Sequence, residues 1–213
     1  MGAALSQMIA DAISRLRVLD TWAFLVVNRS LQNPVCDVLM PILSTKRYIL
    51  LPAAVAVLML LVWGGRRMWI VLAVGVAAVA FSDLSTSLIK ASLHRTRPCH
   101  VIPHVHLLAG CTRSFSLPSN HASNMFAVAT VCWWGFRRFR WALFALAVGV
   151  ASSRVYVGVH YPADALAGAL LGTGVAWACI FCASHTWPGW LDAARSPTPP
   201  SRPESSAAGA CTQ

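Results

Sequence analysis

The sequence predicts an all-α membrane protein, a polytopic bundle of about six transmembrane helices, and three observations support this. Of the 213 residues, 57% are hydrophobic and the mean hydropathy is +0.60. Only 11% of the residues are charged, whereas soluble domains average about 25%. The apolar residues gather into six stretches, several of them near the lower length limit for crossing about 30 Å of hydrocarbon. These stretches are residues 22–44, 48–64, 68–92, 121–136, 141–155 and 162–184.

The residues before the first stretch predict an amphipathic surface helix. They lack the continuous apolar core of a cleavable signal peptide. Apolar residues recur there at helical spacing, at Leu5, Met8, Ile9, Ile13 and Leu16. Because Arg15 and Arg17 lie beside them, we expect this helix to lie on the inner leaflet of the membrane.

Two further segments depart from a simple membrane span. Polar residues and Pro34 interrupt stretch 22–44, which we therefore interpret as an interfacial helix followed by a short span. The C-terminal end is rich in Ser, Pro and Ala and cannot bury apolar surface, which predicts a disordered tail. We accordingly expect an amphipathic segment at 1–20, a membrane-embedded domain at 21–187 and the disordered tail at 188–213.

The net charge of +10 is distributed in a way that favours a membrane over nucleic acid. Arginines cluster in short loops between apolar stretches, at Arg15, Arg17, Arg66, Arg67, Arg137, Arg138 and Arg140. With six crossings these clusters fall on one side, which the positive-inside rule makes cytoplasmic. No basic stripe is interleaved with exposed aromatic residues, so we expect no nucleic-acid partner.

Two of the seven cysteines bracket the loop between the third and fourth stretches, on the predicted outer side. An oxidising compartment permits a disulfide between Cys99 and Cys111. Two free thiols are the alternative.

The first polar motif is Lys90-x6-Arg97-Pro98. Seven residues apart, the two cations share one face of a continuous helix, and Pro98 should end that helix. Taken alone, the two side chains are also explained by contact with lipid headgroups. Asp83, seven residues before Lys90 on the same face, is a functional candidate or a structural partner within the bundle.

The second motif, Pro118-Ser119-Asn120-His121, precedes an apolar helix that begins near Ala122. Ser119 or Asn120 can cap this helix. Its free backbone N–H groups then offer an anion site beside His121. An ordinary N-cap with a surface histidine is the alternative.

The third motif, Ser153-Arg154-x5-His160-x3-Asp164, is the most informative. Pro162 suits the first position of the last helix, which places His160 just before that helix and Asp164 in its first turn. A carboxylate on one ring nitrogen fixes the tautomer and raises the basicity of the other nitrogen. Arg154 offers a planar fork that matches phosphate oxygens. A loop with a satisfied His–Asp pair is the alternative.

Taken together, the residues, order and spacings of the three motifs resemble the type-2 phosphatidic acid phosphatase superfamily of integral-membrane lipid phosphatases. The resemblance covers roughly residues 80–175, and the apolar layout around it is similar to the family's six-helix bundle. It implies that His160 is the nucleophile of a phosphohistidine intermediate, that Asp164 holds it, and that His121 is the general acid. It also implies a phosphate clamp made of Lys90, Arg97, Ser119, Asn120 and Arg154.

One residue departs from the family's pattern, because Asn120 stands where the second motif usually has glycine. Asparagine can still cap a helix or adopt a left-handed conformation. We therefore expect function to survive, and the approach of the Asn120 backbone to phosphate is the feature that the change affects.

The motifs predict catalysis without a metal or other cofactor. Three permanent cations and two helix N-termini can stabilise the charge of a transferring phosphoryl group, so we expect inhibition by vanadate and little effect of chelators. Four histidines in or beside the outer loop lack the carboxylate and firm scaffold that a zinc site needs. We interpret them as solvated or in contact with anionic headgroups: His94, His100, His104 and His106.

The resemblance and the predicted sidedness favour a lipid phosphatase of a bacterial cytoplasmic membrane with its site facing the periplasm. Undecaprenyl diphosphate is the expected substrate; phosphatidylglycerophosphate, phosphatidate and lipid A phosphates are the alternatives. A non-catalytic protein that binds or transports anionic lipid is the alternative of another class, because binding needs only the cations. A haem- or metal-binding membrane protein is a third.

Overall fold

The computed structural model describes residues 2–45, 47–48, 54–55, 57–58, 61–62, 66–135 and 140–186. Over these residues the elements are helices, with no strand among them, so the all-α prediction is confirmed for this part of the chain. In chain order they are α1 (Gly2–Leu25), the π-helix η1 (Val26–Ser30), α2 (Pro34–Ser44), α4 (Arg66–Leu93), α5 (Pro98–Val101), α6 (Asn120–Gly135), α7 (Arg140–Tyr156) and α8 (Pro162–Thr186).

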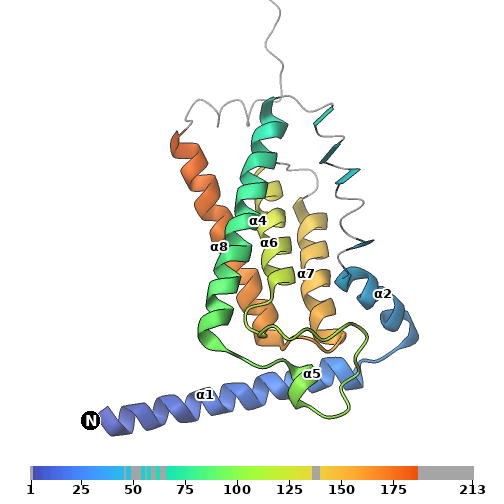
Figure 1. The fold of residues 1–213 in the computed structure, drawn as a ribbon, viewed down its shortest axis with the longest axis vertical. Coiled ribbons are helices and arrows are strands. Elements are labelled where there is room, and N and C mark those ends of the chain that lie inside the picture. Colours follow the sequence, from blue (N-terminus) through green and yellow to red (C-terminus); the bar gives the residue numbers. More distant parts are fainter. Residues whose placement is uncertain are drawn as a thin grey trace, which may run out of the picture.

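Helices α4, α6, α7 and α8 form a bundle in which α6 packs against the other three (Figure 1). Helices α4 and α7 end at the lower end of the bundle in this view, and α6 and α8 begin there. The three polar motifs lie at these four helix ends. The alternating directions of the helices therefore gather distant parts of the sequence at one end of the bundle.

Small residues let α6 and α8 approach each other closely. Gly168, Gly172 and Ala176 are spaced four apart on α8, the small-residue pattern typical of packed membrane helices. A Cβ at Gly168 would lie 2.4 Å from the Ser119 carbonyl oxygen, and a Cβ at Gly172 would lie 1.9 Å from that of Ser123. The backbone at the start of α6, and that of Ser119 just before it, is thus in direct contact with α8.

We expect Gly172→Ala to destabilise the protein, because the added methyl overlaps backbone atoms of Ser123 that cannot move without separating the helices. Overpacking of this kind costs about 1–3 kcal/mol, which should lower the midpoint of thermal unfolding in detergent. Gly174→Ala is the matched control, since a Cβ there meets nothing within 4 Å. Equal midpoints for the two variants would contradict the close contact.

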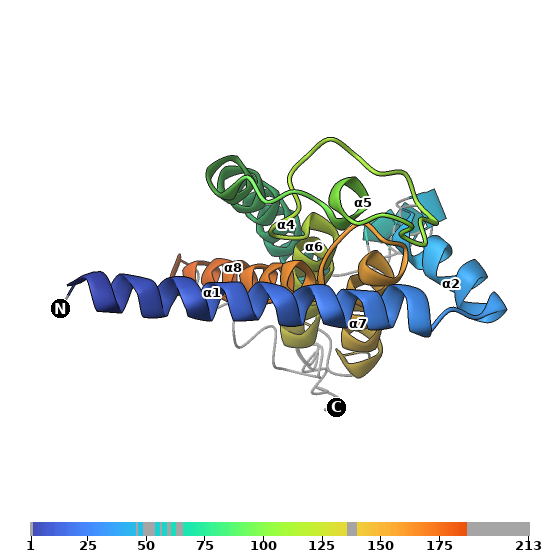
Figure 2. The same ribbon diagram turned by 90° about the horizontal axis from the view of Figure 1, so that it is seen from below.

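The N-terminal helix α1 lies across the end of the bundle that carries the motifs and projects beyond it (Figures 1 and 2). Asp20 fixes it there through contacts with Arg95 and with the Ala163 N–H. Helices α4 and α7 begin at the opposite end, at Arg66 and Arg140. The interpretation that placed Arg15 and Arg17 on the same side as these arginines is therefore wrong.

Helix α1 lies at the motif end because stretch 22–44 is interrupted at residues 31–33. The end of α1 and η1 precede this break, and α2 follows it. The amide of Asn28, a fully buried side chain in η1, donates to the carbonyl oxygens of His106 (2.9 Å) and Tyr156 (2.7 Å). These bonds hold η1 at the motif end of the bundle. Asn33 then caps α2, accepting a hydrogen bond from the Cys36 N–H at 2.9 Å, and Pro34 is its first residue. Stretch 22–44 thus does not carry the chain to the far end as one continuous span.

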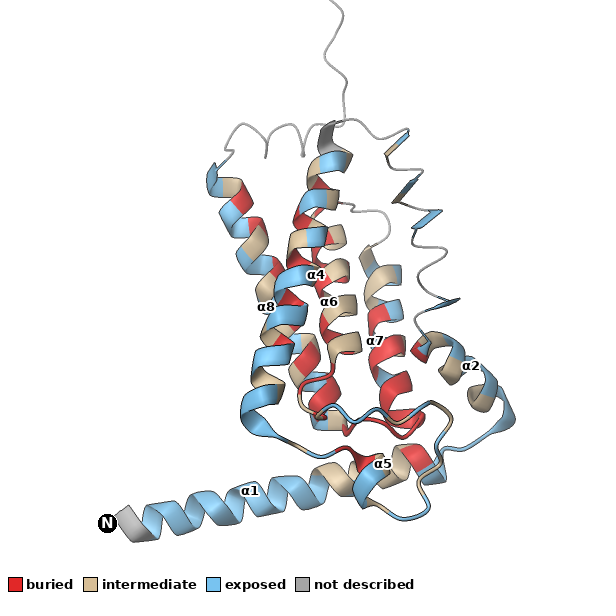
Figure 3. Cartoon of the chain, in the orientation of Figure 1, coloured by how far each residue is buried: buried red, intermediate tan, exposed pale blue. Residues whose placement is uncertain are grey.

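The other predicted apolar stretches correspond to helices wherever the structure describes them. Stretches 68–92, 121–136, 141–155 and 162–184 correspond to α4, α6, α7 and α8, while most of 48–64 and the whole of 188–213 lie outside the described residues. Two segments of the described chain, Met68–Val101 and Pro162–Thr186, are long and apolar enough to cross a membrane. Large apolar side chains lie exposed along α4 and α8, the surface expected of helices that face lipid (Figure 3).

Candidate active site

Polar side chains are buried together at the motif end of the bundle, where Figure 3 shows buried backbone around the helix termini. Six polar residues of the motifs are buried: Arg97, Ser119, Ser153, Arg154, His160 and Asp164. Charged groups are seldom buried unless they are paired. A cluster of two arginines, an imidazole and a carboxylate therefore needs a specific set of contacts.

His160 lies in the short connection between α7 and α8, outside the helices themselves. Its backbone N–H donates to the Arg154 carbonyl oxygen at 3.2 Å. Its side chain is only 2% exposed, and its Nδ1 lies 3.5 Å from Oδ2 of Asp164. The same carboxylate oxygen accepts from the Tyr161 N–H at 2.9 Å, so the first turn of α8 holds the carboxylate against the ring.

Arg97 determines the tautomer of His160. Its Nη1 lies 3.1 Å from Nε2 of the ring. A guanidinium can only donate, so Nε2 accepts and the ring proton is on Nδ1, toward Asp164. The lone pair of Nε2 is thereby directed toward a cation, which is where a phosphate would bind.

Carbonyl oxygens of the loop between α5 and α6 hold two of the cations. Arg97 donates from Nε to the Ser114 carbonyl oxygen (2.7 Å) and from Nη2 to the Ser114 hydroxyl (2.9 Å). Lys90 donates from Nζ to the Phe115 carbonyl oxygen at 2.9 Å. The prediction that Lys90 and Arg97 share one continuous helix is wrong, because α4 ends at Leu93 and Arg97 is extended just before α5. The two cations are instead brought together by the loop that precedes α6.

Arg154 approaches from the last turn of α7. Its Nη1 donates to the carbonyl oxygen of Ser44 at 3.1 Å and also to the Ser44 hydroxyl. Its Nε is buried and has no hydrogen-bond partner among the described residues. An unpaired buried donor costs free energy unless a ligand satisfies it, and a phosphate oxygen is the ligand that a guanidinium fits.

The second motif lies beside this cluster. The Ser119 N–H donates to the Asp164 carbonyl oxygen at 3.0 Å, so α6 and α8 begin next to each other. The Ser119 hydroxyl is fully buried and has no partner among the described residues, as expected of a group that awaits a ligand. His121 follows in the first turn of α6, where its side chain is half-buried.

Asn120 uses its side chain away from the cluster. Its amide donates to Oδ1 of Asp83 at 3.1 Å, and the Asn124 amide donates to the same oxygen at 2.9 Å. Asp83 is therefore a structural link between α4 and α6. The Asn120 side chain, which stands where the family usually has glycine, contributes to this link.

Three further residues hold Asp164 or its partners, and the sequence did not identify them as part of the site. The Ser116 hydroxyl donates to Oδ2 of Asp164 and lies 3.5 Å from Nδ1 of His160. Arg95 donates to Oδ1 of Asp164 at 2.7 Å and also pairs with Asp20 of α1 at 2.6 Å. The spacing of Arg95 from Arg97 was visible in the sequence, but nothing local indicated its partners.

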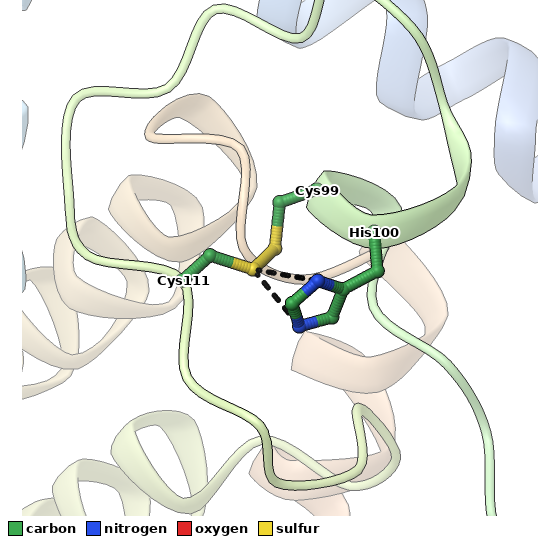
Figure 4. Close-up of side chains that lie close together, drawn as sticks. All are labelled: Cys99, His100 and Cys111. Carbon is green, nitrogen blue, oxygen red and sulfur yellow. Dashed lines mark hydrogen bonds between the residues drawn. A yellow bond between two sulfur atoms is a disulfide. The ribbon is translucent and has the colours of Figure 1, made fainter.

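Cys99 and Cys111 are joined by a disulfide that closes the loop after Arg97 (Figure 4). His100 lies against it, with Nε2 3.3 Å from the Cys111 sulfur. The ligand atoms of these three residues lie within 4.8 Å of one another, close enough to hold a metal ion. Metal-binding thiolates must be free and deprotonated, so the disulfide does not fit a metal centre.

Burial lowers the pKa of His160 from 6.5 to about 4; the Asp164 carboxylate opposes this shift and the Arg97 charge adds to it. The neutral ring therefore predominates above that pH, and only the neutral ring has a lone pair to attack phosphorus. We expect histidine-selective ¹⁵N NMR in micelles to show the His160 ring neutral from pH 8 down to about pH 5, with protonation only below. The His160→Ala variant assigns the signal. A titration midpoint near 6.5 would contradict this environment.

A sequence model of the PAP2 superfamily matches residues 68–187, which include all three motifs and the helices that carry them. The chain belongs to the PAP2 superfamily. The resemblance drawn from the motifs is thus confirmed.

Several curated proteins are similar to this PAP2 chain. The undecaprenyl-diphosphatase of Sulfolobus acidocaldarius is 32% identical over 137 residues, 63% of this chain and 64% of that protein. The lipid A 1-phosphatase of Rhizobium johnstonii is 33% identical over 109 residues, 49% of this chain and 43% of that protein. The bacitracin transport permease protein BcrC of Bacillus licheniformis is 36% identical over 85 residues, 39% of this chain and 42% of that protein. The chain spans less than two thirds of the length of each of these relatives.

Two solved structures share the fold of this PAP2 chain. LpxE of Aquifex aeolicus matches with a TM-score of 0.66 and 23% identity, over 76% of this chain and 95% of that one. A transmembrane PAP2-type phosphatidylglycerolphosphate phosphatase of Bacillus subtilis matches with a TM-score of 0.63 and 22% identity, over 84% and 92%. At this identity the likeness shows a common fold.

Proposed function

We propose that this PAP2 protein is a lipid phosphatase that works through a phosphohistidine. The observation that carries the proposal is the His160 ring, whose Nε2 lone pair is directed at Arg97 while Asp164 holds the opposite nitrogen. Membership of a superfamily that includes lipid phosphatases supports it.

In the first step the Nε2 lone pair of His160 attacks phosphorus. The N–P bond forms as the P–O bond to the lipid breaks, and His121 gives a proton to the departing oxygen. In the second step water attacks phosphorus and gives a proton to His121. The N–P bond breaks, which releases inorganic phosphate and restores neutral His160.

The remaining motif residues bind the phosphate and stabilise the charge that develops on its oxygens. Lys90, Arg97 and Arg154 supply three cations, and the Ser119 hydroxyl and Arg154 Nε supply donors that have no partner within the described part of the chain. Electrostatic stabilisation of this kind is most of what phosphoryl transfer requires. We therefore propose that the reaction needs no metal ion.

We further propose that the site faces the periplasm of a bacterial cytoplasmic membrane. The Cys99–Cys111 disulfide lies at the site end of the bundle, and disulfides persist in oxidising compartments. Helices α4 and α7 begin with Arg66, Arg67 and Arg140 at the opposite end of the bundle, which the positive-inside rule makes cytoplasmic.

Undecaprenyl diphosphate is the proposed substrate, because a related protein is an undecaprenyl-diphosphatase and a periplasmic site would meet the carrier lipid after its glycan has been transferred. Lipid A phosphates, phosphatidylglycerophosphate and phosphatidate are the competing substrates, the first two supported by the names of other relatives. A non-catalytic lipid-binding protein would need the cations but would have no use for the His160–Asp164 pair.

Phosphate release by the purified protein from a panel of these four lipid classes tests the proposal. We expect one class to be preferred, activity to persist in EDTA, and vanadate to inhibit as a mimic of pentacoordinate phosphorus. Activity abolished by EDTA and restored by a divalent metal would contradict the metal-free site. A wild-type protein that is inert on all four classes would favour the binding function instead.

A further inference from the structure

We propose that α1 is part of the catalytic apparatus, because Asp20 and Arg95 act as positioning residues for Asp164. The inference rests on the proposed function, in which Asp164 holds the nucleophile. It adds two residues that the three motifs do not specify and gives the surface helix a role in the reaction.

Asp20 holds two separate parts of the site. Its Oδ2 accepts from Nη2 of Arg95 at 2.6 Å, and its Oδ1 accepts from the backbone N–H of Ala163 at 2.8 Å. Ala163 is in the first turn of α8, where backbone N–H groups have no partner within the helix. A carboxylate from α1 therefore caps α8 one residue before Asp164.

Arg95 joins Asp20 to Asp164. Its Nη1 donates to Oδ1 of Asp164 at 2.7 Å while Nη2 binds Asp20. The planar guanidinium suits this bridge because its donors are held in fixed directions, unlike those of a lysine ammonium. Oδ2 of Asp164 accepts hydrogen bonds from the Ser116 hydroxyl and the Tyr161 N–H. The Arg95 contact holds the other oxygen, so together these bonds fix the rotation of the carboxylate beside His160.

Ring contacts support the same arrangement. The guanidinium of Arg95 lies 4.1 Å from the centroid of the Tyr161 ring. That ring packs against Phe24 of α1, with centroids 5.6 Å apart, and Phe24 is fully buried. Asp20 and Phe24 are one helical turn apart, so one face of α1 holds both the arginine and the segment that carries His160 and Asp164.

The N-terminal part of α1, before Asp20, makes little contact with the bundle. Residues 4–19 are exposed, and their apolar side chains lie on the surface of a helix that crosses the end of the bundle (Figures 2 and 3). Such a helix is suited to the membrane interface. The Asp20–Arg95–Asp164 chain thus connects the seating of α1 with the geometry of the nucleophile.

Steady-state kinetics of Asp20→Asn and Arg95→Gln test the proposal on the best substrate of the wild-type protein. We expect each variant to lose about 10- to 100-fold in kcat, the effect of a displacement of about 1 Å at a reacting group, with KM within about twofold of wild type. Because the two residues share one contact, the double variant should lose less than the product of the single losses. Arg95→Lys keeps the charge but cannot bridge both carboxylates, so it should lose an intermediate amount even if Arg95→Gln does not fold.

Asp11→Asn and Arg113→Gln are matched controls, because they remove the same charges from exposed positions in α1 and in the loop. Both should retain wild-type kcat. Wild-type kcat in Asp20→Asn and Arg95→Lys, or single losses that multiply in the double variant, would overturn the positioning role. An inert wild type would overturn the proposed function itself, a result distinct from active wild type with unaffected variants.

Discussion

His160→Ala is expected to abolish phosphate release, with a loss of at least about four orders of magnitude in kcat, as found when an enzyme loses its nucleophile. No other nitrogen in the described site has the same combination of properties. The ring is neutral because burial lowers its pKa to about 4, its proton is directed to Asp164, and its Nε2 lone pair accepts from Arg97, where a phosphate would bind. The measurement is single-turnover release of inorganic phosphate from the preferred lipid.

His185→Ala is the matched control for this variant, since His185 is an exposed ring at the other end of α8. It should keep wild-type activity and expression. A His160→Ala protein that is folded and retains more than about a tenth of wild-type kcat would show that covalent catalysis at this ring is not used.

Asp164→Asn is expected to lower kcat by about 10³-fold or more, an effect comparable with the loss of the orienting carboxylate in a serine protease triad. Asp164 is fully buried; it accepts hydrogen bonds from Arg95, Ser116 and the Tyr161 N–H, and its Oδ2 lies 3.5 Å from Nδ1 of the His160 ring. An amide has one acceptor oxygen and one donor nitrogen, so it cannot satisfy this set. Its NH₂ group would favour the tautomer with the proton on Nε2, which blocks the lone pair.

Stability should also fall in Asp164→Asn, because the substitution removes one of the two carboxylates that pair with Arg95 and disrupts a buried charged network. Thermal unfolding in detergent measures this loss, and phosphate release by the folded fraction separates it from the loss of chemistry. Asp11→Asn, at an exposed position of α1, should change neither quantity. Full activity in a less stable Asp164→Asn protein would limit the carboxylate to a structural role.

Most of the helical architecture could be predicted from the sequence, because each of the four bundle helices α4, α6, α7 and α8 coincides with an apolar stretch. Helices α4 and α8 follow directly from stretches 68–92 and 162–184. The side on which α1 lies could not be predicted. It depends on whether stretch 22–44 crosses the membrane, and this is decided by the buried amide of Asn28, which bonds to carbonyl oxygens 78 and 128 residues away.

In the candidate site, too, residues in a local pattern could be predicted and residues that contact it from distant parts of the chain could not. His160 and Asp164 could be identified because Pro162 marks the start of a helix and the two residues are four positions apart. Ser116, Arg95 and Asp20 could not, since Ser116 and Arg95 meet Asp164 from 48 and 69 residues away and Asp20 meets Arg95 from 75. Isolated polar residues in an outer loop and a surface helix carry no local pattern that indicates such partners.

The direct test is to trap the intermediate. Protein mixed with lipid carrying a ³²P-labelled reactive phosphate would be quenched within milliseconds in alkali, where phosphohistidine survives, and digested for mass spectrometry. We expect phosphate on the peptide that contains His160, and we expect this label to be lost when His160 is replaced. Turnover without any label on the protein, or label on a residue other than His160, would contradict the proposed role of this ring.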